Sequence, residues 1–272
     1  MKSKRSKARQ CKNLAKEHVE EPDEPAAPTG DSGHARWVQI AVILFRVEID
    51  KSLRETEAYL NTMSPVLDEF NLERSPDHTT ICRWEQKYDM EELRDLLRLS
   101  AEQVGWTGVG AIDASGFQRD QTSYRYRNRA NFSFHSMKTT ILVDAETLVI
   151  KDVHFTTQKA YDGHIGMQVY RRNAEDLQVF LGDKGYSWSE LREECRENGT
   201  RPVIKHKEHN ALKEAHNARI DDDLYHQRWM SETGFSLLKQ DDGERLRSRS
   251  WHGQFRELTR KCIMHNLSQA AS

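Results

Sequence analysis

Three acidic residues stand where they could act together on a phosphate group. Asp113 follows the apolar run 109–112 and Asp183 follows the run 177–182, so each carboxylate is expected at the end of a strand. Glu232 lies within a stretch of helical periodicity over residues 221–239. Carboxylate oxygens are the ligands that hard divalent cations prefer, and a pair of such cations promotes in-line displacement at phosphorus. The combination predicts a two-metal phosphoryl-transfer site.

The predicted helix over 221–239 carries four chemically active side chains on one face. Tyr225, Arg228, Glu232 and Lys239 fall within an arc of about 60° at ~100° per residue. The arginine and lysine can neutralise phosphate oxygens, and the tyrosine can stack or donate a hydrogen bond. Taken alone, the pattern also suits an exposed helix with an ordinary Arg–Glu pair. The two upstream aspartates favour the catalytic interpretation.

Together these motifs resemble the DDE transposases of insertion sequences. The spacing Tyr-x2-Arg-x3-Glu-x6-Lys is the signature of the insertion-sequence-four/insertion-sequence-five superfamily. The sequence Asp-Lys-Gly-Tyr at 183–186 also resembles the motif that many members have at this place. The resemblance covers about residues 35–268. It implies that Asp113, Asp183 and Glu232 are the catalytic residues and bind two Mg²⁺ ions per active site, with Mn²⁺ as a substitute.

The same resemblance implies a function and its partners. The protein is expected to bind the terminal inverted repeats of an insertion sequence and to catalyse metal-dependent strand cleavage and strand transfer on double-stranded DNA, at element ends and target. A homodimer or larger assembly is expected in the DNA complex, in a prokaryotic cytoplasm and associated with the nucleoid. Two alternatives stay open: another ribonuclease H-like nuclease of the resolvase type, and a non-catalytic DNA-binding protein derived from a transposase.

The first eight elements predicted in residues 105–272 are, in order, strand, strand, strand, helix, strand, helix, strand and helix, and a final helix follows them. This order predicts an α/β fold of the ribonuclease H-like class, a mixed five-stranded sheet with helices on both faces. In that fold the first and fourth strands are neighbours, which would bring Asp113 and Asp183 together. The expected strands and helices are 109–114, 136–143, 148–157, 162–173, 177–182, 188–198, 202–205, 221–239 and 251–267.

Residues 34–104 are predicted to be helical and to resemble a helix-turn-helix. A capped helix over 75–88 presents Thr79, Thr80 and Arg83, which suit contact with a DNA groove. However, residues 48–98 hold thirteen acids and seven bases, which argues against strong phosphate affinity. A packing or oligomerisation element is the alternative.

The remaining segments are polar, and charge is unevenly distributed. Residues 1–33 pair a basic block with an acidic, proline-containing stretch and are predicted to be a disordered tail. The net charge of −2 is low for a DNA-binding protein, but basic residues cluster locally. The additional candidates for DNA contact are Lys184, Arg125, Arg127 and Lys138.

Several other kinds of site are disfavoured. The four cysteines are far apart in the sequence, and the histidines at 206, 209, 216 and 226 lack a matched ligand spacing, so zinc is not predicted. No phosphate-binding G-x4-G-K-[ST] loop occurs, so no nucleotide cofactor is expected. No apolar run approaches the ~20 residues of a membrane span, so no membrane association is expected. For Asp162, a structural role as the N-cap of the helix that follows it explains the residue as well as a role in the site does.

Overall fold

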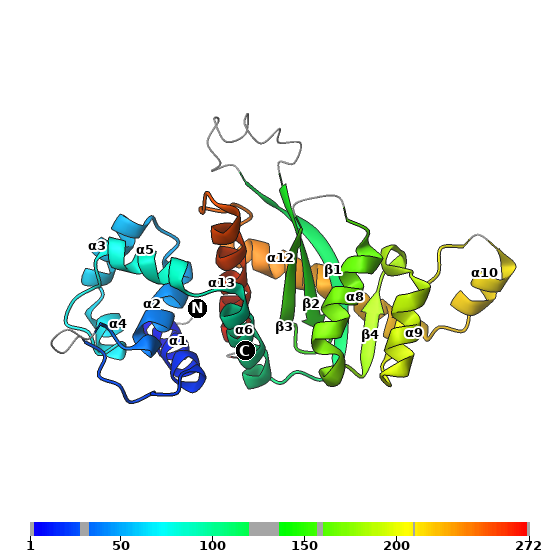
Figure 1. The fold of residues 1–272 in the computed structure, drawn as a ribbon, viewed down its shortest axis with the longest axis horizontal. Coiled ribbons are helices and arrows are strands. Elements are labelled where there is room, and N and C mark those ends of the chain that lie inside the picture. Colours follow the sequence, from blue (N-terminus) through cyan, green and yellow to red (C-terminus); the bar gives the residue numbers. More distant parts are fainter. Residues whose placement is uncertain (1–2, 28–32, 120–135, 157–159, 209, 271–272) are drawn as a thin grey trace. The chain divides into compact units, whose positions relative to one another are not determined.

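The computed structural model describes residues 3–27, 33–119, 136–156, 160–208 and 210–270 (Figure 1). Contacts divide the chain into two compact units, one of Met1–Gln103 with Ser250–Ser272 and the other of Val104–Arg249. The last helix therefore groups with the N-terminal helices, whereas the sequence placed it in a catalytic domain over 105–272. Sequence order does not reveal this grouping, because the contacts that define it are remote along the chain.

The first unit is entirely helical in its described residues. Its centre is α2, whose apolar side chains are buried almost all round and which contacts α1, α5 and α13. Its helices are α1 (Lys4–His18), α2 (Arg36–Ile49), α3 (Leu53–Asn61), α4 (Ser64–Glu69), α5 (His78–Lys87), α6 (Met90–Val104) and α13 (Trp251–Gln269). Within this unit the fully buried Arg260 of α13 forms an ion pair with Glu85 of α5 at 3.0 Å, which fixes the two helices together.

Helix α1 contradicts the prediction of a disordered tail over residues 4–18. Ala8, Cys11 and Leu14 form a narrow buried stripe that packs on the rest of the unit. Their spacing of three residues is helical, but the stripe is too small to stand out among the basic residues around it. Those basic residues are held by one nearly buried carboxylate, Glu69 of α4. Its partners are Arg5, Arg9 and Lys12.

The second unit contains the predicted mixed sheet, in the order β3-β2-β1-β4-β5. Strands β1 and β4 are parallel neighbours, and β2 runs antiparallel to both β1 and β3. This confirms the α/β fold of the ribonuclease H-like class. The strands are β1 (Val109–Gln118), β2 (Ser136–Asp144), β3 (Ile150–Thr156), β4 (Val179–Gly182) and β5 (Arg201–Ile204).

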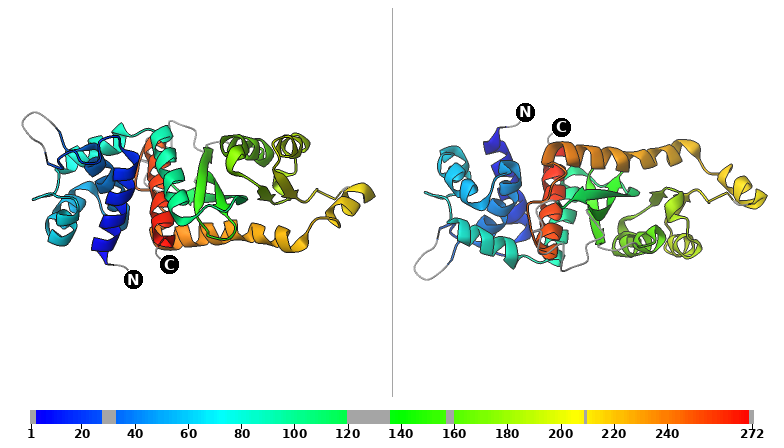
Figure 2. Two further views of the ribbon diagram at one scale, coloured as in Figure 1. Left: turned by 90° about the horizontal axis from the view of Figure 1, so that it is seen from below. Right: turned by 90° about the horizontal axis from the view of Figure 1, so that it is seen from above.

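Helices cover both faces of this sheet, as Figure 2 shows. Alternate residues along a strand point to opposite faces. Ile112 and Phe180 accordingly belong to one apolar cluster with α8 (Asp162–Asn173) and α9 (Ser189–Glu197), while Ala111 and Leu181 belong to another that includes Tyr225. The second face carries α11 (Asp222–His226) and α12 (Met230–Asp242). The remaining short elements are η1 (Ala174–Asp176), η2 (Lys184–Tyr186), α10 (Ala211–Asn217) and η3 (Gln227–Trp229).

The predicted helix over 221–239 is not one regular α-helix. Helix α11 passes through the 3₁₀ turn η3 before α12 begins. A 3₁₀ turn has 3.0 residues per turn in place of 3.6, so it rotates the following residues relative to Tyr225. Gly234 of α12 faces the sheet, where an added Cβ would lie 3.1 Å from Cγ2 of Val143. The lack of a side chain at 234 therefore lets the helix lie close to the strands.

Candidate active site

The sheet places Asp113 and Asp183 side by side. Ile112 pairs with Gly182 in the parallel β1–β4 ladder; Asp113 is the next residue of β1, and Asp183 directly follows the end of β4. Asp113 lies two residues after Ala111, so the two side chains point to the same face of the sheet. Asp183 likewise lies two residues after Leu181, with its backbone in the extended conformation. The alternation of side chains thus turns both carboxylates toward the face that carries α11 and α12. Strand β4 ends at Gly182 while β1 continues, so the site lies beyond the end of β4.

Glu232 approaches this point from the helical layer. The 3₁₀ turn η3 contacts both β1 and β4, and Glu232 is in the first turn of α12 immediately after it. Nη1 of Arg228 lies 3.3 Å from Oε1 of Glu232, an i,i+4 ion pair. Glu232 is 63% exposed and Asp183 is also exposed, whereas Asp113 is half-buried. Two of the three carboxylates therefore remain accessible to a ligand.

The electrostatics of Asp113 show that the three carboxylates influence one another. The pKa of Asp113 is raised to about 6, mainly by burial and then by the negative charges of Asp183 and Glu232, against the opposing effects of a backbone hydrogen bond from Ala114 and of Arg228. Close carboxylates with too few positive partners have this effect, because each charge disfavours ionisation of the next. A divalent cation would relieve the repulsion.

The spacing of the three side chains is wider than one shared ion requires. Within the described parts of the chain, three ligand atoms come within 4.8 Å of one another at Glu57, Asp77 and His78, and not at Asp113, Asp183 and Glu232. Two ions about 3.5–4 Å apart need one carboxylate between them and one on either side. Asp113 is the most deeply placed of the three and is influenced by both of the others, which suits that arrangement better than a single-ion cage.

A backbone amide fixes the orientation of Asp183. The N–H of Gly185 donates to its Oδ1 at 2.7 Å, which begins the 3₁₀ turn η2. A Cβ at position 185 would lie 2.8 Å from the same oxygen, closer than non-bonded atoms approach. Glycine at this position is therefore needed for the carboxylate to keep its place.

The basic and aromatic candidates around the triad occupy different surroundings. The ring of Tyr225 is nearly buried, with Nζ of Lys205 at 4.4 Å and Cζ of Arg228 at 5.3 Å from its centre. Lys239 lies over the ring of Phe117 at 5.5 Å and forms an ion pair with Glu244 at 3.3 Å. Lys184 forms an ion pair with Glu208 at 2.8 Å. Arg125 and Arg127 fall outside the described residues.

The structure adds an acidic residue to the surroundings of the site. Asp162, interpreted from the sequence as a possible N-cap, is the first residue of α8; the N-cap is Tyr161, and the helix has no side-chain cap there. The Asp162 carboxylate instead forms an ion pair with Lys138 of β2. Lys138 was a candidate from sequence, but nothing in the local pattern indicated its partner, since the two residues meet only when α8 covers the sheet.

In the helical unit, the candidates for base contact lie on α5. Thr79 and Arg83 are exposed and Thr80 is half-exposed, as a recognition helix requires. Asp77 caps this helix by accepting from the backbone N–H of Thr79 at 2.8 Å, and it also binds the Thr79 hydroxyl. The hydroxyl of Thr79 is thus partly committed to the cap, which leaves Thr80 and Arg83 as the freer side chains.

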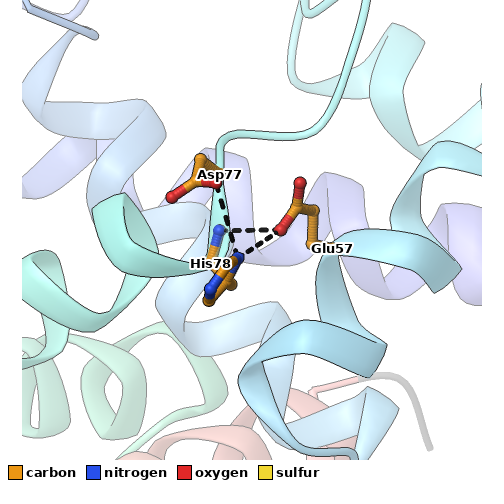
Figure 3. A group of neighbouring side chains, drawn as sticks. All are labelled: Glu57, Asp77 and His78. Carbon is orange, nitrogen blue, oxygen red and sulfur yellow. Dashed lines mark hydrogen bonds and ion pairs between the residues drawn. The ribbon is translucent and has the colours of Figure 1, made fainter.

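Figure 3 shows the compact group of Glu57, Asp77 and His78 at the start of α5. Oε2 of Glu57 accepts hydrogen bonds from the backbone N–H of His78 at 3.0 Å and meets its Nδ1 at 2.7 Å. These contacts join α3 to the N-terminus of α5. The ring nitrogen and both carboxylates are already engaged in this connection, so the arrangement is explained by helix positioning.

Residues 107–267 match a family model described as the transposase DDE domain. The match spans more than half of the chain and includes Asp113, Asp183 and Glu232, and so the protein belongs to the DDE transposase domain family. No curated protein matches the chain. Among the described residues, no helix is long and apolar enough to cross a membrane.

Proposed function

We propose that the protein is the transposase of a prokaryotic insertion sequence of the insertion-sequence-four/insertion-sequence-five superfamily. It would bind the terminal inverted repeats, cleave DNA at the element ends and join them to target DNA. The observation that supports the proposal is the electrostatic influence of Asp183 and Glu232 on Asp113, beside the end of β4, in a chain of the DDE transposase domain family. These three residues would be the catalytic set.

The donor set fits Mg²⁺, or Mn²⁺ in its place. It consists of carboxylate oxygens, and the raised pKa of Asp113 marks a place where burial and neighbouring negative charge favour a cation. Two bound ions would supply activation of the attacking hydroxyl and stabilisation of the leaving oxygen. Asp113, Asp183 and Glu232 would hold them, and Gly185 would keep Asp183 in orientation.

Basic and aromatic side chains would hold the DNA. Around the triad these are Tyr225, Arg228, Lys239, Lys184 and Lys138, and arginines 125 and 127 are proposed to join them. Thr79, Thr80 and Arg83 on α5 would read the element ends. A homodimer or larger assembly would bring two ends together, in the nucleoid-containing cytoplasm of a prokaryote.

The test is cleavage of duplex oligonucleotides that carry the inverted repeats flanking the gene. Purified protein should nick them with Mg²⁺ or Mn²⁺ and not with Ca²⁺, and Asp183→Ala should abolish nicking. Four-way junctions and unrelated duplexes serve as competing substrates. Preferential cutting of junctions would replace the transposase assignment by a resolvase-type nuclease, and binding without any cutting would support a non-catalytic DNA-binding protein.

A further inference from the structure

An ion pair lies on the α8-covered face of the sheet, opposite to the face of Asp113, and approaches the site at Asp183, which follows β4. Lys138 of β2 pairs across the sheet with Gly116 of β1, three residues beyond Asp113. Its ammonium group binds the carboxylate of Asp162, the first residue of α8. Both side chains are 35% exposed, so the pair is accessible from solvent.

The glycine at 185 relates this pair to the metal site. An atom placed at the Cβ position of Gly185 would lie 2.8 Å from Oδ1 of Asp183 and 3.5 Å from Oδ2 of Asp162. The two carboxylates therefore border the same small space. The ion pair of Asp162 with Lys138 therefore borders the space next to Asp183.

A buried phenol lies in the same surroundings. Tyr186 is 2% exposed, and burial, followed by the negative charges of Asp162, Asp113 and Asp183, raises its pKa. Thr140 is a polar neighbour, yet the Tyr186 hydroxyl has no hydrogen bond of ordinary geometry within the described residues. Tyr186 is thus influenced by Asp162 together with Asp113 and Asp183, which relates Asp162 to the candidate metal site.

We propose, on the basis of the function proposed above, that Asp162 is a positioning residue which holds Lys138 at the Asp183 side of the site to bind a phosphate oxygen of the DNA. An ammonium group has three donors, so its bond to Asp162 leaves others for the phosphate. A lysine side chain is otherwise flexible, and fixing it before DNA binds reduces the entropy lost on binding. Asp162 acts through Lys138 and does not touch the DNA itself.

The direction in which Asp162→Asn changes the affinity for DNA tests this role. Removing a negative charge near DNA phosphates ordinarily strengthens binding, but Asp162→Asn should weaken it roughly tenfold because Lys138 is released, a loss typical of one charge-assisted hydrogen bond. Lys138→Met should weaken binding to a similar extent. In the Lys138→Met background, Asp162→Asn should instead leave affinity unchanged or raise it. Affinities are measured in Ca²⁺ on an element-end duplex and on a duplex of unrelated sequence.

A matched control is Glu194→Gln on α9. It breaks the exposed ion pair of Glu194 with Arg171, which lies on α8 as Asp162 does, and it should not alter DNA binding. Stronger binding by Asp162→Asn in the otherwise unchanged protein would overturn the proposal. So would a higher Mg²⁺ requirement for cleavage in that variant, since it would make Asp162 a metal ligand. The binding results decide the role of Asp162 even if the unchanged protein does not cleave DNA, which is the separate test of the proposed function.

Discussion

Two groups of carboxylates in this protein differ in how their charges are satisfied. At the start of α5, Glu57 and Asp77 accept hydrogen bonds from backbone and side-chain donors, and those from Thr79 lower the pKa of Asp77. At the end of β4, burial and two further carboxylates raise the pKa of Asp113. The first group is the more compact, yet its bonds are complete within the chain. The burial of Asp113 near two other carboxylates, more than close spacing, distinguishes the candidate metal site.

The largest expected effect comes from the second group. Asp113→Asn, Asp183→Asn and Glu232→Gln should each reduce Mg²⁺-dependent cleavage by at least about a thousandfold, because each removes a charged ligand from the two-metal set. Binding to element ends should be kept or strengthened. Single-turnover cleavage and a binding titration of each variant give the two quantities.

Glu57→Gln is the matched control for these variants, since it makes the same carboxylate-to-amide change in the compact group. It should leave the cleavage step intact once DNA is bound. If it abolishes cleavage at saturating DNA while Glu232→Gln does not, the roles assigned to the two groups are reversed.

A smaller effect is expected from moving α12 without changing its chemistry. Gly234→Val places side-chain atoms where Val143 already lies, so the helix and Glu232 should shift away from the strands. Displacements of about 1 Å can cost roughly a hundredfold in rate, and we expect cleavage to fall by about ten- to a hundredfold with DNA binding little changed. Gly33→Val is the control, because an added Cβ there meets no described atom within 4 Å. Equal cleavage by both variants would show that close packing at 234 does not position Glu232.

The helical unit can be tested through its preference for element ends. Arg83→Ala should reduce the discrimination between an element end and random DNA by about 1–3 kcal/mol, the value of one base contact. Competition binding measures this ratio directly, with Lys87→Ala on the same helix as the control. If both variants keep the ratio of the unchanged protein, α5 is a packing element and recognition lies elsewhere.

The smallest effect is on stability, and its pH dependence has opposite signs in the two groups. The pKa of Asp113 is raised from 3.8 to about 6, so its contribution to stability is complete below pH 3.8 and is lost as the pH rises through 6. Without divalent ions, Asp113→Asn should therefore be more stable than the unchanged protein at pH 8, by about 1–2 kcal/mol, and not at pH 4. Denaturant unfolding at both pH values measures the difference.

Asp77 provides the contrast, because hydrogen bonds from Thr79 lower its pKa. Its contribution is present above the unfolded pKa of 3.8 and is lost as the pH falls through the lower folded value. Asp77→Asn should lower the Tm at pH 8, with the difference shrinking in acid. Added Mg²⁺ should raise the Tm of the unchanged protein and of Asp77→Asn, but have little effect on Asp113→Asn. An equal response of all three would place the cation elsewhere.

Much of the fold was predictable because it is encoded locally. The alternation along the strands assigns residues 111 and 112 to opposite faces of the sheet. The apolar runs before Asp113 and Asp183 predict strands that end in acids, which is confirmed for β4 but wrong for β1, since β1 continues past Asp113 to Gln118. The order of the elements then predicts the mixed sheet, which the structure confirms. The prediction of one regular helix over 221–239 was wrong in detail, since the 3₁₀ turn η3 interrupts the helix where the chain contacts β1 and β4.

Contacts between distant segments decided the rest. Helix α1 is ordered because Glu69 meets three basic residues across more than fifty positions of chain, and α13 joins the first unit through Arg260 and Glu85. Asp162 finds Lys138 only after α8 covers the sheet. By itself, the sequence predicted which residues would carry the chemistry, and it determined the period of the elements that hold them. Tertiary structure decided which charges are balanced and which are left for a ligand, because that depends on burial and on partners that are remote along the chain.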